Sequence, residues 1–173
     1  MMNGSATYFN CLEHRFARWL NWYWIESPIM TDIPHHRRAD YKAIRAVPTR
    51  WMDNDHYGHV NNVTYYSYFD TAVNGFLIEA SDIDIRELPA IGIVAESSCR
   101  FLSATSFPDT VYAGIAVERL GRSSVVYQIG LFRNDEQTPC AFGRFVHVYV
   151  DRLTRRPVPI PEAIRNVVEA LIR

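Results

Sequence analysis

The chain has 173 residues, of which 48% are hydrophobic and 21% are charged, a composition that suits one compact globular domain with its own core. Basic and acidic residues nearly cancel at a formal net charge of -1, so the sequence carries no broad basic surface for nucleic acid. The three cysteines lack CxxC spacing and the paired histidines of a zinc site, which favours a reducing, cytoplasmic setting.

Residues 1–40 are interpreted as an N-terminal extension, and residues 41–173 as the folded domain. Charged residues such as Glu13 and Arg15 interrupt the aromatic stretch near the start, so no apolar run reaches the ~20 residues of a membrane span. A secretory signal places its basic residues before the apolar stretch, and here the order differs. We therefore expect neither a membrane segment nor a secretory leader; the extension is either an amphipathic surface helix or a poorly ordered appendage.

The first elements of the folded domain are a strand, a polar loop and a long helix. Residues 42–51 alternate in hydrophobicity, as in an edge or entry strand, and lead into the polar residues 53–61. From Asn62 onward, apolar residues recur every three or four positions, which predicts a helix of about five turns with Asn61 or Asn62 as its N-cap. The predicted apolar face consists of Val63, Tyr66, Phe69, Val73, Phe76, Leu77 and Ala80.

Four strand-like runs follow the helix, separated by short turns that favour antiparallel pairing. Prolines at residues 157–161 end the sheet, and a final helix is expected over residues 162–172. One long apolar helix and a largely antiparallel sheet predict an α+β layer in which the sheet wraps the helix. The four predicted strands are residues 91–102, 110–120, 123–133 and 139–150.

The sheet edges predict self-association. An exposed edge strand offers unpaired backbone groups to another chain, and a second copy of the same chain is the simplest cover for it. We expect residues 110–120 or 139–150 to form such an edge, and therefore a homodimer or homotetramer.

Polar and ionisable side chains are concentrated in the segment WMDNDHYGHVNN, residues 51–62, between the first strand and the helix. Gly58 permits a tight turn there. The first amides of the helix, with the helix dipole, can stabilise a developing negative charge. A carboxylate beside them can attack an acyl carbonyl or deprotonate water, and a thiolate leaves without a strong acid.

This segment resembles the four-hydroxybenzoyl-CoA thioesterase group of the hot-dog superfamily, in which Asp-x-Asp-x-x-Gly-x-Val precedes a helix rich in tyrosine and small residues. The resemblance spans about residues 42–161 and includes LGRSS at residues 120–124. It implies a hot-dog fold, an antiparallel sheet wrapped around one long central helix, and acyl-CoA thioester hydrolysis. The sequence shows no metal cluster, Gly-rich nucleotide loop or Ser-His-Asp signature, so we expect the chemistry to need no metal or other cofactor. The matching positions are Asp53, Asp55, Gly58, Val60, Tyr65, Tyr66 and Phe69, followed by Arg100, Phe101, Gly143 and His147.

The resemblance assigns roles by position. Asp55 matches the catalytic aspartate, as nucleophile or general base, and the amide near Asn62 matches the group that polarises the thioester carbonyl. Gly58 shapes the turn of this catalytic loop. His59 either orients the loop and contacts substrate or is a hydrogen-bonded structural histidine, whereas Asp53 is expected to hydrogen bond the loop.

The same resemblance implies that an acyl-CoA partner lies along a dimer cleft, with its phosphates near basic residues. Arg122 suits phosphate because of its fixed fork of donors, although a charged residue at a hairpin needs no ligand to explain it. The substrate-binding candidates are Tyr57, Val60 and Asn61 in the loop and Arg122, Ser123 and Ser124 in the LGRSS turn.

Two other functions remain open on the same fold. An acyl-CoA dehydratase or hydratase would divide a histidine and an acid between loop and helix, where Asp70 and Glu79 are available. The loop, however, lacks the His-Phe-Pro-Gly arrangement of such dehydratases. A non-catalytic acyl-CoA binding module is the other alternative, because a fold does not fix an activity.

Overall fold

The structure is a computed structural model that describes residues 37–173, which belong to one compact unit. Most of the predicted N-terminal extension, residues 1–36, lies outside the described residues. The elements are β1 (Ala43–Pro48), α2 (Asn62–Ser81), β2 (Ala90–Phe101), β3 (Thr110–Leu120), β4 (Ser124–Arg133), β5 (Ala141–Asp151) and α3 (Glu162–Glu169), with short 3-10 turns at Arg38–Asp40 and Trp51–Asp53.

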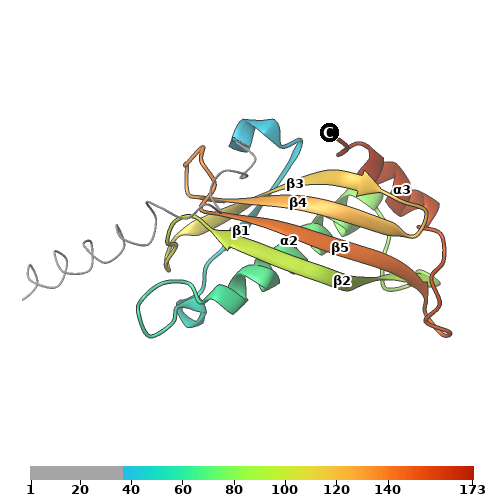
Figure 1. The fold of residues 1–173 in the computed structure, drawn as a ribbon, viewed down its shortest axis with the longest axis horizontal. Coiled ribbons are helices and arrows are strands. Elements are labelled where there is room, and N and C mark those ends of the chain that lie inside the picture. The colour runs from blue at the N-terminus through green and yellow to red at the C-terminus, as the bar shows by residue number, and fades with distance from the viewer. Residues whose placement is uncertain (1–36) are drawn as a thin grey trace, which may run out of the picture. The chain divides into compact units, whose positions relative to one another are not determined.

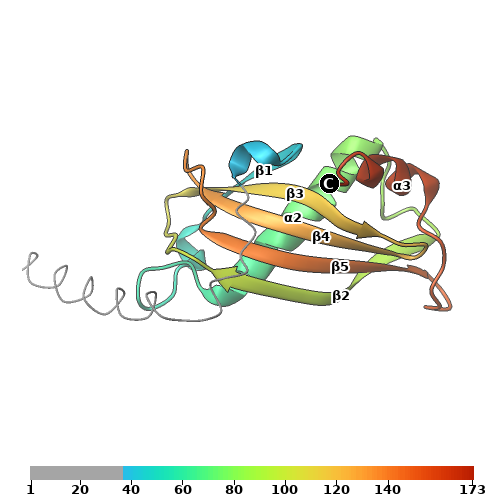
Figure 2. The same cartoon turned by 45° about the horizontal axis from the view of Figure 1, so that its top comes forward.

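The five strands form one antiparallel sheet in the order β1-β3-β4-β5-β2. Helix α2 lies across one face of this sheet in both views (Figures 1 and 2). This confirms the predicted α+β arrangement of a sheet wrapped around one long helix. The boundaries of β2 to β5 agree with the prediction to within two residues, whereas β1 ends three residues before the predicted end at residue 51. Alternation of side chains across a strand is a local property of the sequence.

The edges of the sheet differ from the prediction. Strand β3 lies between β1 and β4, and β5 lies between β4 and β2, so neither of the two strands expected at an edge is one. The edges are β1 and β2. The prediction was wrong because β1 pairs with β3 and not with β2, the next strand along the chain. Pairing between strands that are distant in sequence is not encoded in any local pattern.

Helix α2 buries part of the predicted face, with Phe69, Val73 and Leu77 in the core and Tyr66 and Phe76 packed against it. The buried positions recur at three- and four-residue spacing, but they begin at Tyr65, whereas Val63 is 65% exposed and Ala80 is also exposed. Tyr65 and Tyr68 are buried while Val63 and Ala80 are exposed, because large aromatic side chains gain most from burial. The buried residues of α2 are Tyr65, Tyr68, Phe69, Ala72, Val73 and Leu77.

The C-terminal helix α3 is shorter than the predicted helix of residues 162–172. It ends at Glu169 because the chain beyond it pairs with β3, where the amide of Val117 donates to the carbonyl of Leu171 at 3.0 Å. Within residues 37–173, none of the helices is long and apolar enough to cross a membrane.

Candidate active site

The loop between β1 and α2 is closed by its own backbone. The amide of Asp55 donates to the carbonyl of His59 at 2.7 Å, and the amide of Gly58 donates to the carbonyl of Asp55 at 3.1 Å. Gly58 has a φ of +83° with open space where a Cβ would lie. The positive φ, and not crowding, therefore requires glycine at this turn.

The carboxylate of Asp55 is oriented by this loop. Its Oδ1 accepts hydrogen bonds from the amides of Tyr57 at 2.7 Å and His59 at 3.4 Å, and its side chain is half-buried. Within residues 37–173, no hydrogen bond to Oδ2 of Asp55 is found. One oxygen is thus held while the other is available to a reacting group.

The start of helix α2 lies directly after this carboxylate. Asn61 is the N-cap, as predicted, and its side chain accepts from the amide of Val63 at 3.1 Å. The amide of Asn62, by contrast, has no acceptor in the described part of the chain. A free first-turn amide at the positive end of a helix dipole is a binding position for a carbonyl or oxyanion.

Asp53 holds the loop against the core. Its buried carboxylate accepts from the backbone amide of Arg50 at 2.7 Å, from the guanidinium of Arg50 at 2.8 Å and 3.0 Å, and from the hydroxyl of Tyr68 at 2.9 Å. Burial alone would raise the pKa of Asp53, but these hydrogen bonds lower it below its usual value. Asp53 is therefore a structural anion, which agrees with the expectation that it hydrogen bonds the loop.

The other loop candidates divide between core and surface. Val60 is 5% exposed and belongs to the core, whereas Tyr57 is 75% exposed. His59 is half-buried, and within residues 37–173 its imidazole makes no hydrogen bond. The structure therefore joins Tyr57, Gly58 and His59 to Asp55 by hydrogen bonds, whereas Val60 packs into the core.

The LGRSS turn lies at the opposite end of the sheet from Asp55 (Figure 1). It joins β3 to β4 and is fastened to the C-terminal region, where the amide of Ile160 donates to the carbonyl of Arg122 at 2.9 Å. The 10 residues of β4 separate the two ends by roughly 30 Å. Within one chain, Arg122, Ser123 and Ser124 are therefore not part of the Asp55 loop's surroundings.

The acidic residues of α2 are on its solvent side. Asp70 is exposed and its Oδ1 accepts from Asn74 at 3.1 Å. Glu79 forms an ion pair with Arg45 and is also exposed. The partners of the two carboxylates are thus Asn74 and Arg45 rather than a loop histidine, and this arrangement gives no support to the dehydratase alternative.

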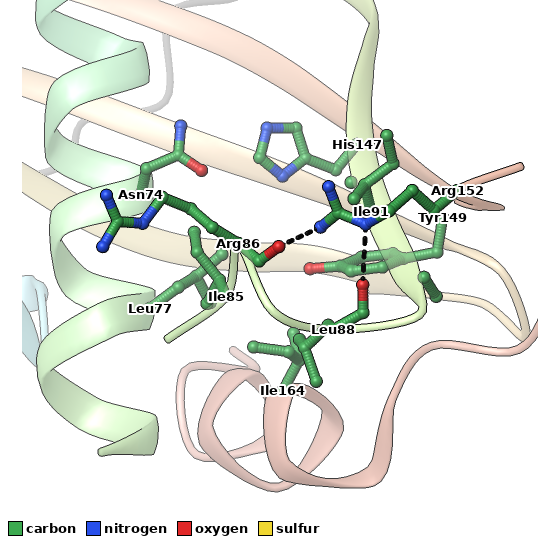
Figure 3. A pocket seen from close by; sticks show the side chains of 12 residues that line it. Asn74, Leu77, Ile85, Arg86, Leu88, Ile91, His147, Tyr149, Arg152 and Ile164 are labelled. Atoms are coloured by element: carbon green, nitrogen blue, oxygen red, sulfur yellow. Dashed lines mark hydrogen bonds between the residues drawn. The ribbon is translucent and has the colours of Figure 1, made fainter. Parts of the chain in front are cut away.

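A cavity of about 230 Å³ lies away from the loop, between α2, β2, β5 and the segment before β2 (Figure 3). None of the predicted site residues lines it. Its buried polar residue is His147, which is 1% exposed and whose Nδ1 has no partner in the described part of the chain. Sequence reasoning missed this site, although His147 alternates with Phe145 and Tyr149 on one strand face and is a polar residue at a core position.

His147 predicts a loss of stability in mild acid. Burial lowers its pKa from 6.5 to about 4, so between these values the unfolded chain binds a proton that the folded chain rejects. The free energy of unfolding should therefore fall by about 2 kcal/mol between about pH 7 and about pH 5 through this group alone. Urea unfolding at the two pH values measures it, with His147→Leu as the control. An equal pH dependence in the variant would contradict the assignment.

A metal site is not evident in the described residues. Across residues 37–173, no group of three or more histidine, cysteine, aspartate or glutamate side chains is arranged to hold a metal ion. The chemistry available at the loop is that of a carboxylate, a histidine and backbone amides.

Comparison with known proteins agrees with the fold. A family model described as the thioesterase-like superfamily matches residues 47–168.

The crystal structure of the PA5185 protein from Pseudomonas aeruginosa is 48% identical, with a TM-score of 0.77 over 80% of this chain and 97% of that one. The PA2801 protein of the same species is 31% identical, with a TM-score of 0.67 over 72% of this chain and 96% of that one. A Thermus thermophilus thioesterase, solved with coenzyme A and zinc, is 31% identical, with a TM-score of 0.63 over 76% of this chain and 94% of that one. The chain therefore belongs to the thioesterase-like superfamily, and thioester hydrolysis is its class of reaction.

Proposed function

We propose that this protein hydrolyses acyl-CoA thioesters to a free acid and CoA, with Asp55 as the reacting carboxylate. The observation that carries the proposal is the pairing of an oriented Asp55, whose Oδ2 makes no hydrogen bond within residues 37–173, with the acceptor-free amide of Asn62 at the start of α2. The coenzyme A bound to the related Thermus thermophilus thioesterase supports a CoA ester as the substrate.

In the proposed reaction, the thioester carbonyl accepts a hydrogen bond from the amide of Asn62, and the helix dipole stabilises the oxyanion. Asp55 either attacks the carbonyl carbon, giving a mixed anhydride that water then hydrolyses, or takes a proton from the attacking water. In both routes the carbon–sulfur bond breaks and the CoA thiolate leaves and is protonated. In this proposal, Gly58 holds the loop geometry and His59 contacts the substrate.

The substrate-binding proposal needs two subunits. Tyr57, Val60 and Asn61 lie in the Asp55 loop before α2, but Arg122, Ser123 and Ser124 lie where β3 turns into β4, at the other end of the sheet of the same chain. Antiparallel pairing of two β2 edges would bring the loop end of one subunit to the turn end of the other. We therefore propose a cytoplasmic homodimer, or a tetramer of such dimers, in which CoA lies across the junction.

Strand β2 has the properties of the proposed dimer edge. It is 12 residues long and exposed along most of its length. Proteins usually cover or blunt such long exposed edges, so this one is expected to have a partner. Apolar side chains lie along it, with Ile93 at 40% and Val94 at 47% exposure. A second copy would bury this apolar surface and complete the backbone hydrogen bonds of the edge.

Ile93→Glu should weaken the dimer, because it places a charge in the surface that the second copy covers. Ile44→Glu is the matched control, since Ile44 is 43% exposed on the opposite edge strand, β1. Light scattering after size-exclusion chromatography should give a dimer or larger assembly for wild type and Ile44→Glu and a smaller species for Ile93→Glu. Dissociation by Ile44→Glu alone would assign the interface to β1 instead.

The activity is tested by release of free thiol from short, medium, long and aromatic acyl-CoAs. Turnover of any of them is the expected result, and its dependence on the acyl group gives the specificity. If thiol is released only from acyl-carrier-protein substrates, the substrate is an acyl-carrier-protein thioester and not an acyl-CoA. Binding of acyl-CoA without thiol release would favour the non-catalytic module.

A further inference from the structure

The cavity beneath β2 is built for a small and mainly apolar group. Its volume of about 230 Å³ is below the ~300–1,000 Å³ typical of sites for whole drug-sized ligands, so it suits the end of an acyl chain or a single ring. Carbon surfaces make up much of its wall. The aliphatic lining residues are Leu77, Ile85, Leu88, Ile91 and Ile164.

One polar group inside the cavity lacks a partner. His147 lines the cavity at 1% exposure, and its Nδ1 makes no hydrogen bond within residues 37–173. Buried polar atoms are almost always hydrogen bonded, so an unpartnered one indicates a missing donor or acceptor. Because burial lowers the pKa of His147 to about 4, its ring is neutral near pH 7 and offers one donor and one acceptor.

The charged groups around the cavity are already engaged. Arg86 forms an ion pair with Asp84 at 2.7 Å, and the guanidinium of Arg152 donates to the backbone carbonyls of Leu88, at 3.1 Å, and Arg86. Burial raises the pKa of Tyr149 to about 12, so its hydroxyl stays protonated. No carboxylate is among the lining residues. The cavity therefore favours an uncharged group with one hydrogen-bonding atom over a cation.

Gly92 leaves the approach to His147 open. A Cβ on Gly92 would lie 3.2 Å from Nδ1 of His147 and 3.3 Å from the ring of Tyr149. Figure 3 shows His147 and Asn74 beside the same space, one from β5 and the other from α2. A side chain at residue 92 would thus occupy the space that a ligand atom needs to reach the imidazole.

We propose that this cavity binds the far end of the substrate's acyl group, and that His147 hydrogen bonds a hydroxyl or keto oxygen there. The inference rests on the proposed function and the proposed dimer. From Asn62, beside the loop, to Asn74, in the cavity wall, the helix rises by ~18 Å. The Asp55 loop of the same chain is therefore far from the cavity. Antiparallel β2 edges, however, place the loop of the second subunit at this end. The substrates it selects are short acyl-CoAs with an oxygen near the end of the chain.

The test compares a plain straight-chain acyl-CoA with its counterparts of equal length that carry a terminal hydroxyl or a keto group. Wild type should prefer the oxygenated esters. His147→Leu should reduce kcat/KM for them by roughly tenfold or more, because their polar group then enters the cavity without a partner. The plain ester should change little. His147→Gln, which restores a donor and an acceptor, should recover part of the preference.

Gly92→Ala is the second variant, because it leaves His147 in place and narrows the approach to it. It should also reduce the preference for the oxygenated esters. Two results would overturn the subsite but not the proposed function. One is that every variant loses activity on the plain and oxygenated esters by the same factor. The other is that His147→Leu and Gly92→Ala both keep the wild-type preference. Absence of thiol release from every ester by wild type would overturn the proposed function, and the subsite with it.

Discussion

Asp55→Asn is expected to lower the turnover of acyl-CoA by on the order of 100-fold or more, because loss of a general base or nucleophile removes the step that it performs. The substitution keeps an oxygen at the position that accepts from the amides of Tyr57 and His59. The loop geometry should therefore survive while the basicity is lost. Thiol release under saturating substrate measures the effect.

The control for Asp55→Asn separates chemistry from folding. Its free energy of unfolding should stay within about 1 kcal/mol of wild type. Asp70→Asn is the matched acid-to-amide change on the exposed side of α2, and we expect it to leave thiol release unchanged. Retained activity in Asp55→Asn would overturn the assignment. Loss of activity in Asp70→Asn instead would direct attention to the helix, as in the dehydratase alternative.

Asp53→Ala is expected to destabilise the fold by about 3 kcal/mol, because it leaves buried hydrogen-bond donors without their acceptor. The hydroxyl of Tyr68, in a side chain that is 3% exposed, loses its acceptor at 2.9 Å, and the amide of Arg50 loses one at 2.7 Å. The exposed guanidinium of Arg50 can instead turn to water. Urea unfolding at neutral pH measures the loss.

A double-mutant cycle tests whether the loss of stability in Asp53→Ala comes from the hydrogen bond to Tyr68. Tyr68→Phe alone should cost about 1 kcal/mol, and with Asp53→Ala it should cost less than the sum of the two changes, because both remove the same hydrogen bond. The folded pKa of Asp53 lies below its unfolded value, so its contribution is present above the unfolded pKa and is lost as the pH falls through the folded pKa. Strict additivity would show that Asp53 acts through other contacts.

The turn around Gly58 and the N-cap at Asn61 could be predicted from the sequence because their geometry is local. The hydrogen bonds that shape the turn join Asp55 to Tyr57, Gly58 and His59, all within a few positions, and the N-cap Asn61 acts within the same turn. Turn chemistry and capping depend on neighbouring residues, so they can be recognised without a fold. The boundaries of β2 to β5 followed from side-chain periodicity for the same reason, whereas the ends of β1 and α3 did not.

By itself, the sequence determined the α+β elements and the polar loop that holds Asp55 before the helix. Tertiary structure alone decided that β1 pairs with β3 and leaves β2 at the edge, that α2 buries Tyr65 and Tyr68, and that the LGRSS turn lies far from Asp55 in one chain. The cavity at His147 belongs to this second group, because Asn74, Ile91 and His147 reach it from three separate elements. Contacts between distant segments depend on pairing and packing across the whole chain, which periodicity within a window of residues does not encode.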